Sequence, residues 1–149
     1  MKRHYILAGA GLLWAAAGAA QAACEFAIEV GDTMLYSVEE MVVEKSCDTI
    51  QVDMKHTGSM PEVAMGHNWV LAKTADMEGI AKDGMAAGLE NEYLQPGDER
   101  VIAATEVIGG GEATSISFSP TDLEIGGDYK FFCSFPGHYT VMQGDFIVQ

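Results

Sequence analysis

A cysteine, a histidine and a methionine near the carboxyl terminus have the residue types and the spacing of a metal site. Cys133, His138 and Met142 follow the pattern Cys-x4-His-x3-Met. Thiolate and thioether groups are soft ligands that select copper, zinc or iron–sulfur clusters. A cysteine, two histidines and a long axial methionine are typical of electron-transfer copper, and a thioether is not a usual zinc ligand. The pattern therefore predicts a copper site that needs a second histidine.

The second histidine must come from another part of the chain. The remaining histidines are His4, His56 and His67. His67 follows Gly66 and precedes Asn68 and an apolar, strand-like run, whereas His56 has no such glycine or polar neighbour beside it. We expect His67 to join the site and His56 to be a buried structural imidazole.

The first residues are typical of a secretory signal. A basic start precedes an apolar stretch at 6–17, and Ala20-Gln21-Ala22 then matches the small-x-small site of signal peptidase. The apolar stretch is too short for a transmembrane helix. We predict a signal peptide at residues 1–22 and a single exported domain at residues 23–149.

The cysteine count fits export. Disulfides form and persist outside the cytosol, and an odd count leaves one thiol for another purpose. Because Cys133 belongs to the ligand pattern, Cys24 and Cys47 are left to pair. Lipidation of Cys24 is the alternative, but Gln21 stands where lipoprotein signals normally carry an aliphatic residue.

The charge of the exported domain limits its partners. Removing Lys2 and Arg3 leaves six basic residues against 22 acidic ones, a net charge of −16 with neutral histidines. Nucleic acid is excluded because it binds clustered lysine and arginine, and an anionic membrane surface is disfavoured for the same reason. The acidic surface either serves solubility alone or also steers a basic redox partner.

Short β-like segments separated by glycine-rich turns dominate the domain. Apolar and polar residues alternate at 24–30 and 49–56, the period of a half-buried strand. Further strands are expected at 41–44, 67–73, 100–104, 115–119, 129–133 and 145–149. Many short strands at this spacing predict an all-β fold, an antiparallel Greek-key sandwich or barrel of about eight strands. Residues 74–89 predict one short, irregular helix inserted between strands.

These elements bring the carboxyl-terminal ligands to one end of the sandwich. Cys133 is expected to end a strand and Met142 to begin the last one, with a tight loop between them. Pro136 has a fixed backbone angle, and Gly137 can adopt conformations closed to other residues. A stiff loop of this kind would hold the ligand geometry nearly unchanged in both oxidation states.

From residue 23 onward the chain resembles the azurins, blue copper proteins of the cupredoxin family. The resemblance rests on the runs MGHNWVL (65–71), DGM (83–85), RVIA (100–103) and FFCSFPGH (131–138). Plastocyanin-like relatives usually have other ligand-loop lengths and lack the helical insert. The resemblance implies a cupredoxin (plastocyanin-like) domain in the periplasm, with the Cys24–Cys47 disulfide.

It also implies a ligand set. Three residues would be strong copper ligands: His67, Cys133 and His138. Two groups would be weak ligands: the Met142 thioether and the Gly66 carbonyl oxygen. Asn68 would brace the two ligand loops and hydrogen-bond near the Cys133 sulfur, as would the Phe135 backbone N–H, and such outer contacts tune a metal's potential.

A fully protein-ligated copper implies a one-electron carrier rather than an enzyme. The Cu(II)/Cu(I) couple would exchange electrons through the outer edge of His138, which an apolar docking patch would surround. The residues of this patch would be Met34, Met65, Met85, Phe135 and Pro136, although core packing is the alternative for Met34 and Met85. Redox proteins such as c-type cytochromes or copper and haem reductases would be the partners of a monomer without stable membrane association. The alternative function is copper binding and delivery in the periplasm.

Overall fold

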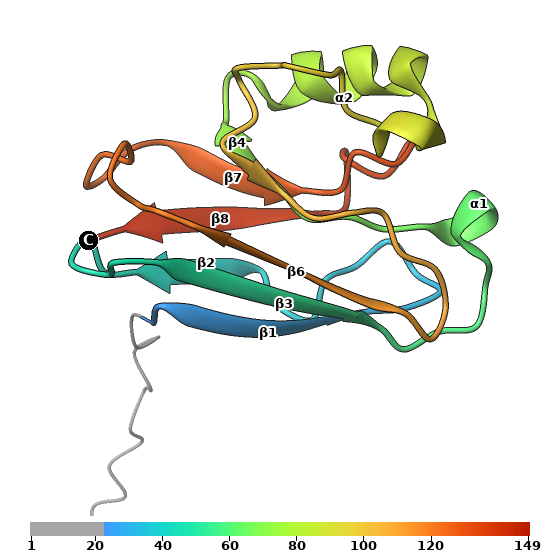
Figure 1. The fold of residues 1–149 in the computed structure, drawn as a ribbon, viewed down its shortest axis with the longest axis horizontal. Coiled ribbons are helices and arrows are strands. Elements are labelled where there is room, and N and C mark those ends of the chain that lie inside the picture. Colours follow the sequence, from blue (N-terminus) through green and yellow to red (C-terminus); the bar gives the residue numbers. More distant parts are fainter. Residues whose placement is uncertain (1–22) are drawn as a thin grey trace, which may run out of the picture.

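Residues 23–149, which the computed structural model describes, form two β-sheets packed face to face (Figure 1). The three-stranded sheet has the order β1 (Glu25–Val30), β3 (Ile50–His56), β6 (Ala113–Phe118). The five-stranded sheet has the order β2 (Glu40–Val43), β8 (Gln143–Val148), β7 (Tyr129–Phe132), β4 (Val70–Lys73), β5 (Ala103–Ala104). These eight strands confirm the predicted all-β sandwich. The predicted signal peptide, with His4, lies outside the described residues.

Two strand pairs differ from the predicted antiparallel arrangement. β1 runs parallel to β3, and β2 runs parallel to β8, whereas the other pairs are antiparallel. The chain leaves the first sheet after β1, forms β2 in the other sheet and returns as β3. A strand that returns after such a crossover can pair in the same direction as the strand it left. Period-2 patterning carries no information about strand direction.

The core lies between the sheets, where the alternating residues of each strand meet. In β3, Ile50, Val52 and Met54 are buried, while the residues between them face outward. Trp69 is fully buried and joins the two layers, with ring centroids 6.0 Å from Phe118 of β6 and 6.2 Å from Phe146 of β8. Aromatic pairs at such distances favour association beyond their buried area.

The predicted inserted helix is present as α2 (Met77–Ala87), which lies over β4 and β7 on the outer side of the five-stranded sheet (Figure 1). Ile80 and Ala81 on its inner face pack with Val70 and Phe132 of the sheet. The helix ends where Gly88 takes a φ of 81°. Glycine adopts this angle at little cost, so the glycine that weakens the helical pattern also terminates the helix.

Two short helices and two strand ends were not predicted. α1 (Glu62–Met65) and the 3-10 helix η1 (Leu89–Asn91) are single turns, too short to show a periodic pattern. The strand expected at 100–104 is reduced to β5, because the Arg100 backbone N–H bonds to the Asp98 carboxylate in a turn. β4 begins only at Val70, because His67 pairs instead with Ile108 in an isolated bridge.

Among residues 23–149, no helix is long and apolar enough to cross a membrane.

The predicted disulfide joins Cys24 to Cys47, just before the starts of the neighbouring strands β1 and β3. We expect the Cys24→Ser, Cys47→Ser double variant to have a free energy of unfolding lower by about 3 kcal/mol, because the bond closes a loop of moderate length in the unfolded chain. Urea unfolding of the oxidised parent and the variant measures the difference. The reduced parent is the control and should approach the variant; equal stability of variant and oxidised parent would contradict the expectation.

Candidate metal centre

Three side chains from two distant segments converge at one end of the sandwich. Cys133 directly follows β7, His138 lies in the loop from β7 to β8, and His67 precedes β4. Their ligand atoms all lie within 4.8 Å of one another. The Cys133 Sγ is 3.8 Å from the His67 Nδ1 and 3.6 Å from the His138 Nδ1. All three side chains are buried, so the cluster forms a closed pocket of one sulfur and two nitrogen donors.

The loop between β7 and β8 holds two of these donors. The Cys133 N–H donates to the Met142 carbonyl at 3.1 Å, and the Met142 N–H donates to the His138 carbonyl at 2.8 Å. Gly137 has a φ of 83°, the left-handed conformation that the tight turn requires. The predicted tight loop is therefore present. Cys133 and Met142 lie just outside β7 and β8 rather than at their ends, and the Met142 side chain is fully buried.

His67 is held in place by its backbone and by its ring. Its backbone exchanges hydrogen bonds of 3.0 and 2.9 Å with Ile108. The preceding Gly66 has no room for a side chain, since a Cβ there would lie 2.5 Å from the Glu62 carbonyl oxygen. The His67 Nε2 lies 2.8 Å from the carbonyl oxygen of Gly31, which can only accept a hydrogen bond. The proton is therefore on Nε2, and the Nδ1 lone pair is left to face Cys133.

His56 is not part of the donor cluster. Its ring is fully buried and stacks on His67 with centroids 5.1 Å apart. Its Nε2 donates to the Met65 carbonyl at 3.1 Å, and its Nδ1 accepts the Gly58 N–H at 3.1 Å. Both ring nitrogens have partners, so His56 is the buried structural imidazole that the sequence predicts.

Asn68 links the two ligand-bearing segments. Its amide nitrogen donates to the Ser134 hydroxyl at 2.8 Å, and its amide oxygen accepts the Ser134 N–H at 2.9 Å. Since Asn68 follows His67 and Ser134 follows Cys133, this pair of bonds fixes the distance between two of the donors. These bonds are what the bracing role expected of Asn68 requires.

Comparisons with known proteins show to which family a chain with this fold and this donor cluster belongs. Residues 22–149 match the model of the family described as copper binding proteins, plastocyanin/azurin family. The chain belongs to this family. It is 55% identical over 123 residues to an azurin from Achromobacter denitrificans, covering 83% of each chain. It is 49% identical over 128 residues to an azurin from Pseudomonas chlororaphis, covering 86% of this chain and all of that one.

A solved structure shares the fold as well. The azurin Az-iso2 from Methylomonas sp. strain J superimposes with a TM-score of 0.82 and is 47% identical. The superposition covers 86% of this chain and 99% of that chain. The cupredoxin-like sandwich and the relationship to azurins are therefore established by sequence and by structure.

The donor set of this family member suits copper. One soft sulfur and two imidazole nitrogens meet in a buried space, with a buried thioether in the same loop. Cys133 is free, while the other two cysteines form the disulfide. Asp and Glu, the ligands that hard cations prefer, are absent from this donor group as it stands in residues 23–149.

Burial shifts the protonation of all three donors. It raises the pKa of Cys133 to about 12, although the backbone N–H groups of Asn68 and Phe135 act in the opposite direction. Burial and the neighbouring His67 lower the pKa of His138 to about 4, and burial likewise lowers the pKa of His67. At neutral pH both imidazoles are thus neutral and ready to bind a metal, whereas Cys133 must lose a proton when the metal binds.

The five residues expected around His138 differ in exposure. Met34 is 40% exposed and Met85 is 44% exposed, so neither is a core residue. Met65 and Pro136 are half-buried. Phe135 is nearly buried and packs on His138, with ring centroids 4.6 Å apart. The exposed methionines are compatible with the expected docking patch. The nearly buried Phe135 would lie below the surface of this patch and support it.

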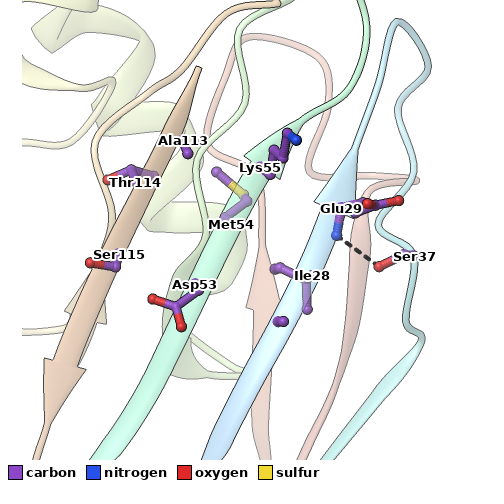
Figure 2. Close-up of a pocket in the computed structure, with 10 residues that line it drawn as sticks. Ile28, Glu29, Ser37, Asp53, Met54, Lys55, Ala113, Thr114 and Ser115 are labelled. Atoms are coloured by element: carbon purple, nitrogen blue, oxygen red, sulfur yellow. Dashed lines mark hydrogen bonds between the residues drawn. The ribbon is translucent and has the colours of Figure 1, made fainter. Parts of the chain in front are cut away.

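A groove of about 610 Å³ lies elsewhere, on the outer face of the three-stranded sheet (Figure 2). Charged side chains of Glu29, Asp53 and Lys55 stand along it, and the Glu29 backbone N–H donates a hydrogen bond of 2.9 Å to the Ser37 hydroxyl at its edge. Ile28 and Met54 are buried in the core, so they contribute mainly backbone to the groove. None of the three donors lines it, and it provides no route to them.

Several residues that hold the centre were not found from the sequence. They are Gly31, Glu92, Thr105, Ile108 and Ser134. Ser134 adjoins Cys133, and its position beside a ligand was the one available signal. The others lie 25 or more positions from any donor, and only the fold brings them close.

We expect the copper-free protein to lose stability as the pH falls from 6.5 towards 4. His138 has a pKa of about 4 in the folded state and an ordinary value of 6.5, so the unfolded chain takes up its proton first. Urea unfolding over this pH range measures the decline. The His138→Gln variant has no titrating ring and should show a shallower decline; an identical slope in both proteins would contradict the assignment.

Proposed function

We propose that this chain is a periplasmic electron carrier with one copper ion of the blue, type 1 class. The supporting observation is the convergence of one free, buried thiol and two buried imidazoles within 4.8 Å. When bound, copper would supply a Cu(II)/Cu(I) couple for one-electron exchange. Family membership among copper-binding proteins supports the same function.

The ligand roles follow from position. His67, Cys133 and His138 would provide the strong equatorial donors through Nδ1, Sγ and Nδ1. The buried Met142 thioether would be a weak axial ligand, and the Gly66 carbonyl oxygen would face the metal from the other side. Gly66 suits this role because the crowded backbone at that point excludes any larger residue.

The protein keeps the donors in one arrangement by means of hydrogen bonds outside the ligand set. Gly31 orients the His67 ring, Asn68 ties its segment to Ser134, and the Met142 backbone closes the loop onto Cys133. Backbone N–H groups of Asn68 and Phe135 favour a charged sulfur. A site held in this way changes little when an electron arrives or leaves, which favours fast electron exchange.

Electron transfer fits this geometry better than copper delivery or catalysis. A delivery protein must expose its metal to a recipient, whereas Cys133 and Met142 are fully buried here. An enzyme needs an open position for substrate, whereas five protein groups would surround the ion in this proposal. We therefore infer no enzymatic activity.

The partners would be redox proteins such as c-type cytochromes or copper and haem reductases. The patch of Met34, Met65, Met85, Phe135 and Pro136 would provide a small apolar face for brief encounters between this monomer and its partner.

The surface charge favours a basic partner. Most of the cations in residues 23–149 are already engaged: Lys82, Arg100 and Lys130 form ion pairs, and the Lys45 ammonium donates to backbone carbonyls. A hollow beside the His67–Ile108 bridge is lined by four carboxylates, those of Glu62, Glu92, Glu106 and Glu112. Burial, Glu112 and Glu92 raise the pKa of Glu62, which reflects the concentration of negative charge there.

The proposed location is the periplasm, reached through a signal peptide at residues 1–22 that is removed from the domain at 23–149. The Cys24–Cys47 disulfide supports an oxidising compartment. Family members named azurin support the placement by analogy.

We expect Cys133→Ala to abolish the blue colour of the copper-loaded protein, because the colour arises from charge transfer between a cysteine sulfur and Cu(II). Met142→Leu should keep the colour and change the reduction potential, since only a weak ligand is lost. Visible spectroscopy and voltammetry measure the two effects. A Cys133→Ala protein that stayed blue would refute the ligand assignment, and a colourless parent that binds only Cu(I) would favour delivery.

We also expect electron exchange with a basic c-type cytochrome to slow by about tenfold between low and physiological ionic strength, because salt screens long-range attraction. Stopped-flow mixing at a series of salt concentrations measures the rate. An acidic cytochrome is the matched control, and its rate should rise with salt. A rate that is independent of salt for both partners would show that the acidic surface serves solubility alone.

A further inference from the structure

The segment that contains η1 carries no expected ligand, yet Glu92 in this segment contacts both ligand-bearing segments. The Glu92 carbonyl accepts hydrogen bonds from the Asn68 amide at 3.0 Å and from the Ser134 hydroxyl at 3.3 Å. Asn68 adjoins His67, and Ser134 adjoins Cys133. One carbonyl oxygen therefore joins the neighbours of two donors that lie 66 positions apart.

The side chain of Glu92 reaches a third segment. Its Oε2 accepts the backbone N–H of Val107 at 2.6 Å. Val107 precedes Ile108, whose backbone pairs with His67, and Val107 also packs where a side chain at Gly66 would stand. A carboxylate that accepts a backbone N–H makes a short, charge-assisted bond of roughly twice the strength of a neutral one.

The backbone of Glu92 adopts a conformation that a side chain disfavours. Its φ and ψ are 59° and 24°, in the left-handed region, and its N–H donates to the Leu89 carbonyl at 2.9 Å. This region costs a residue other than glycine about 1 kcal/mol. The hydrogen bonds that the carbonyl and the carboxylate of Glu92 accept offset this cost.

Neighbouring contacts hold the segment firmly. The Tyr93 carbonyl packs against Gly84 of α2 so closely that a side chain at Gly84 would collide with it. The Tyr93 ring meets Phe135 edge-on with centroids 5.1 Å apart, and Phe135 in turn packs on His138. Tyr93, the neighbour of Glu92, thereby connects α2 with the loop of His138.

We propose that Glu92 is a positioning residue of the metal centre, whose carbonyl ties the two ligand segments together and whose carboxylate ties both to the segment of Val107 and Ile108. This inference rests on the proposed function in one respect, namely that the donors hold copper. Glu92 is not a ligand and acts only through Asn68, Ser134 and the strand-like pairing of His67. Removing the Glu92 carboxylate would break the bond to Val107, so the segment of Val107 and Ile108 would no longer be tied through Glu92 to the two ligand segments.

Reach and charge can be separated by substitution. Glu92→Asp keeps the charge and tolerates the left-handed backbone, but it is one methylene too short to reach the Val107 N–H. Glu92→Gln keeps the reach and an acceptor oxygen while it removes the charge. Glu106→Gln is the matched control, because Glu106 lines the same acidic hollow but its carboxylate does not contact the ligand segments.

Two measurements test the proposal. The first is amide hydrogen exchange of Val107 in the copper-free protein, which should be about tenfold faster in Glu92→Asp and close to the parent in Glu106→Gln; Glu92→Gln, which keeps the acceptor oxygen but loses the charge, should show a smaller increase. The second is the release of copper to a chelator, which should also be about tenfold faster in Glu92→Asp alone, the loss typical of removing a group that orients a metal ligand. The visible spectrum of Glu92→Asp should change shape, whereas Glu92→Gln should keep the parent spectrum.

A Glu92→Asp protein with parental exchange at Val107 and parental copper release would overturn the proposal. Equal acceleration of copper release in Glu92→Gln and Glu106→Gln, with none in Glu92→Asp, would also overturn it, because charge rather than position would then be responsible. Failure of the proposed function is a separate result: the parent would not hold copper, whereas exchange at Val107 would still report on Glu92.

Discussion

The structure depends on enclosing three metal-binding side chains where water cannot reach them. A buried thiol resists ionisation, as the raised pKa of Cys133 shows, and two adjacent buried imidazoles resist protonation. The arrangement is therefore poorly suited to holding charges of its own and well suited to a cation that neutralises a thiolate. Burial disfavours the free anion and favours the metal-bound one, and the remaining features of this end of the sandwich keep the pocket closed.

Enclosing the three donors requires hydrogen bonds within one loop and hydrogen bonds between segments that lie far apart in the sequence. The loop from Cys133 to Met142, which carries two donors, is closed by its own backbone hydrogen bonds. His67 lies in the distant segment before β4, so its position depends on the bridge to Ile108, the bond to Gly31 and the network of Asn68 and Ser134. Glu92 adds a bond to each side of this junction. Rigidity at the centre is thus distributed among neighbours of the ligands.

The sandwich has two different surfaces around this centre. The interior joins both sheets through Trp69 and its aromatic neighbours, and this rigid body fixes where β4 and β7 end. The exterior carries a large acidic excess. Three of the six cations in residues 23–149 form ion pairs, and Lys45 is bonded to backbone carbonyls. Long-range attraction and short-range contact can therefore be supplied by different residues, carboxylates for the approach and exposed methionines for the encounter.

Features that depend on neighbours along the chain could be predicted from the sequence. The spacing of Cys133, His138 and Met142 lies within one loop, the cysteine count left one pair for a disulfide, and alternation marked β1 and β3. The glycine before His67 was also a signal in the local sequence. The structure explains it, because the surroundings of this glycine leave no room for a side chain. Single-turn helices were missed because one turn is shorter than the period that reveals a helix.

Only the tertiary structure decided which remote segments meet. The parallel direction of β1 and β3, the exposure of Met34 and Met85, and the contacts of Gly31 and Glu92 with the centre depend on sheet register and on the placement of the inserted helix. Glutamate at position 92 has no distinctive neighbours in the sequence, and its meaning comes from a left-handed backbone and three partners on other segments. Hydrogen bonds between such segments form only after the core has packed, so local patterns carry no trace of them.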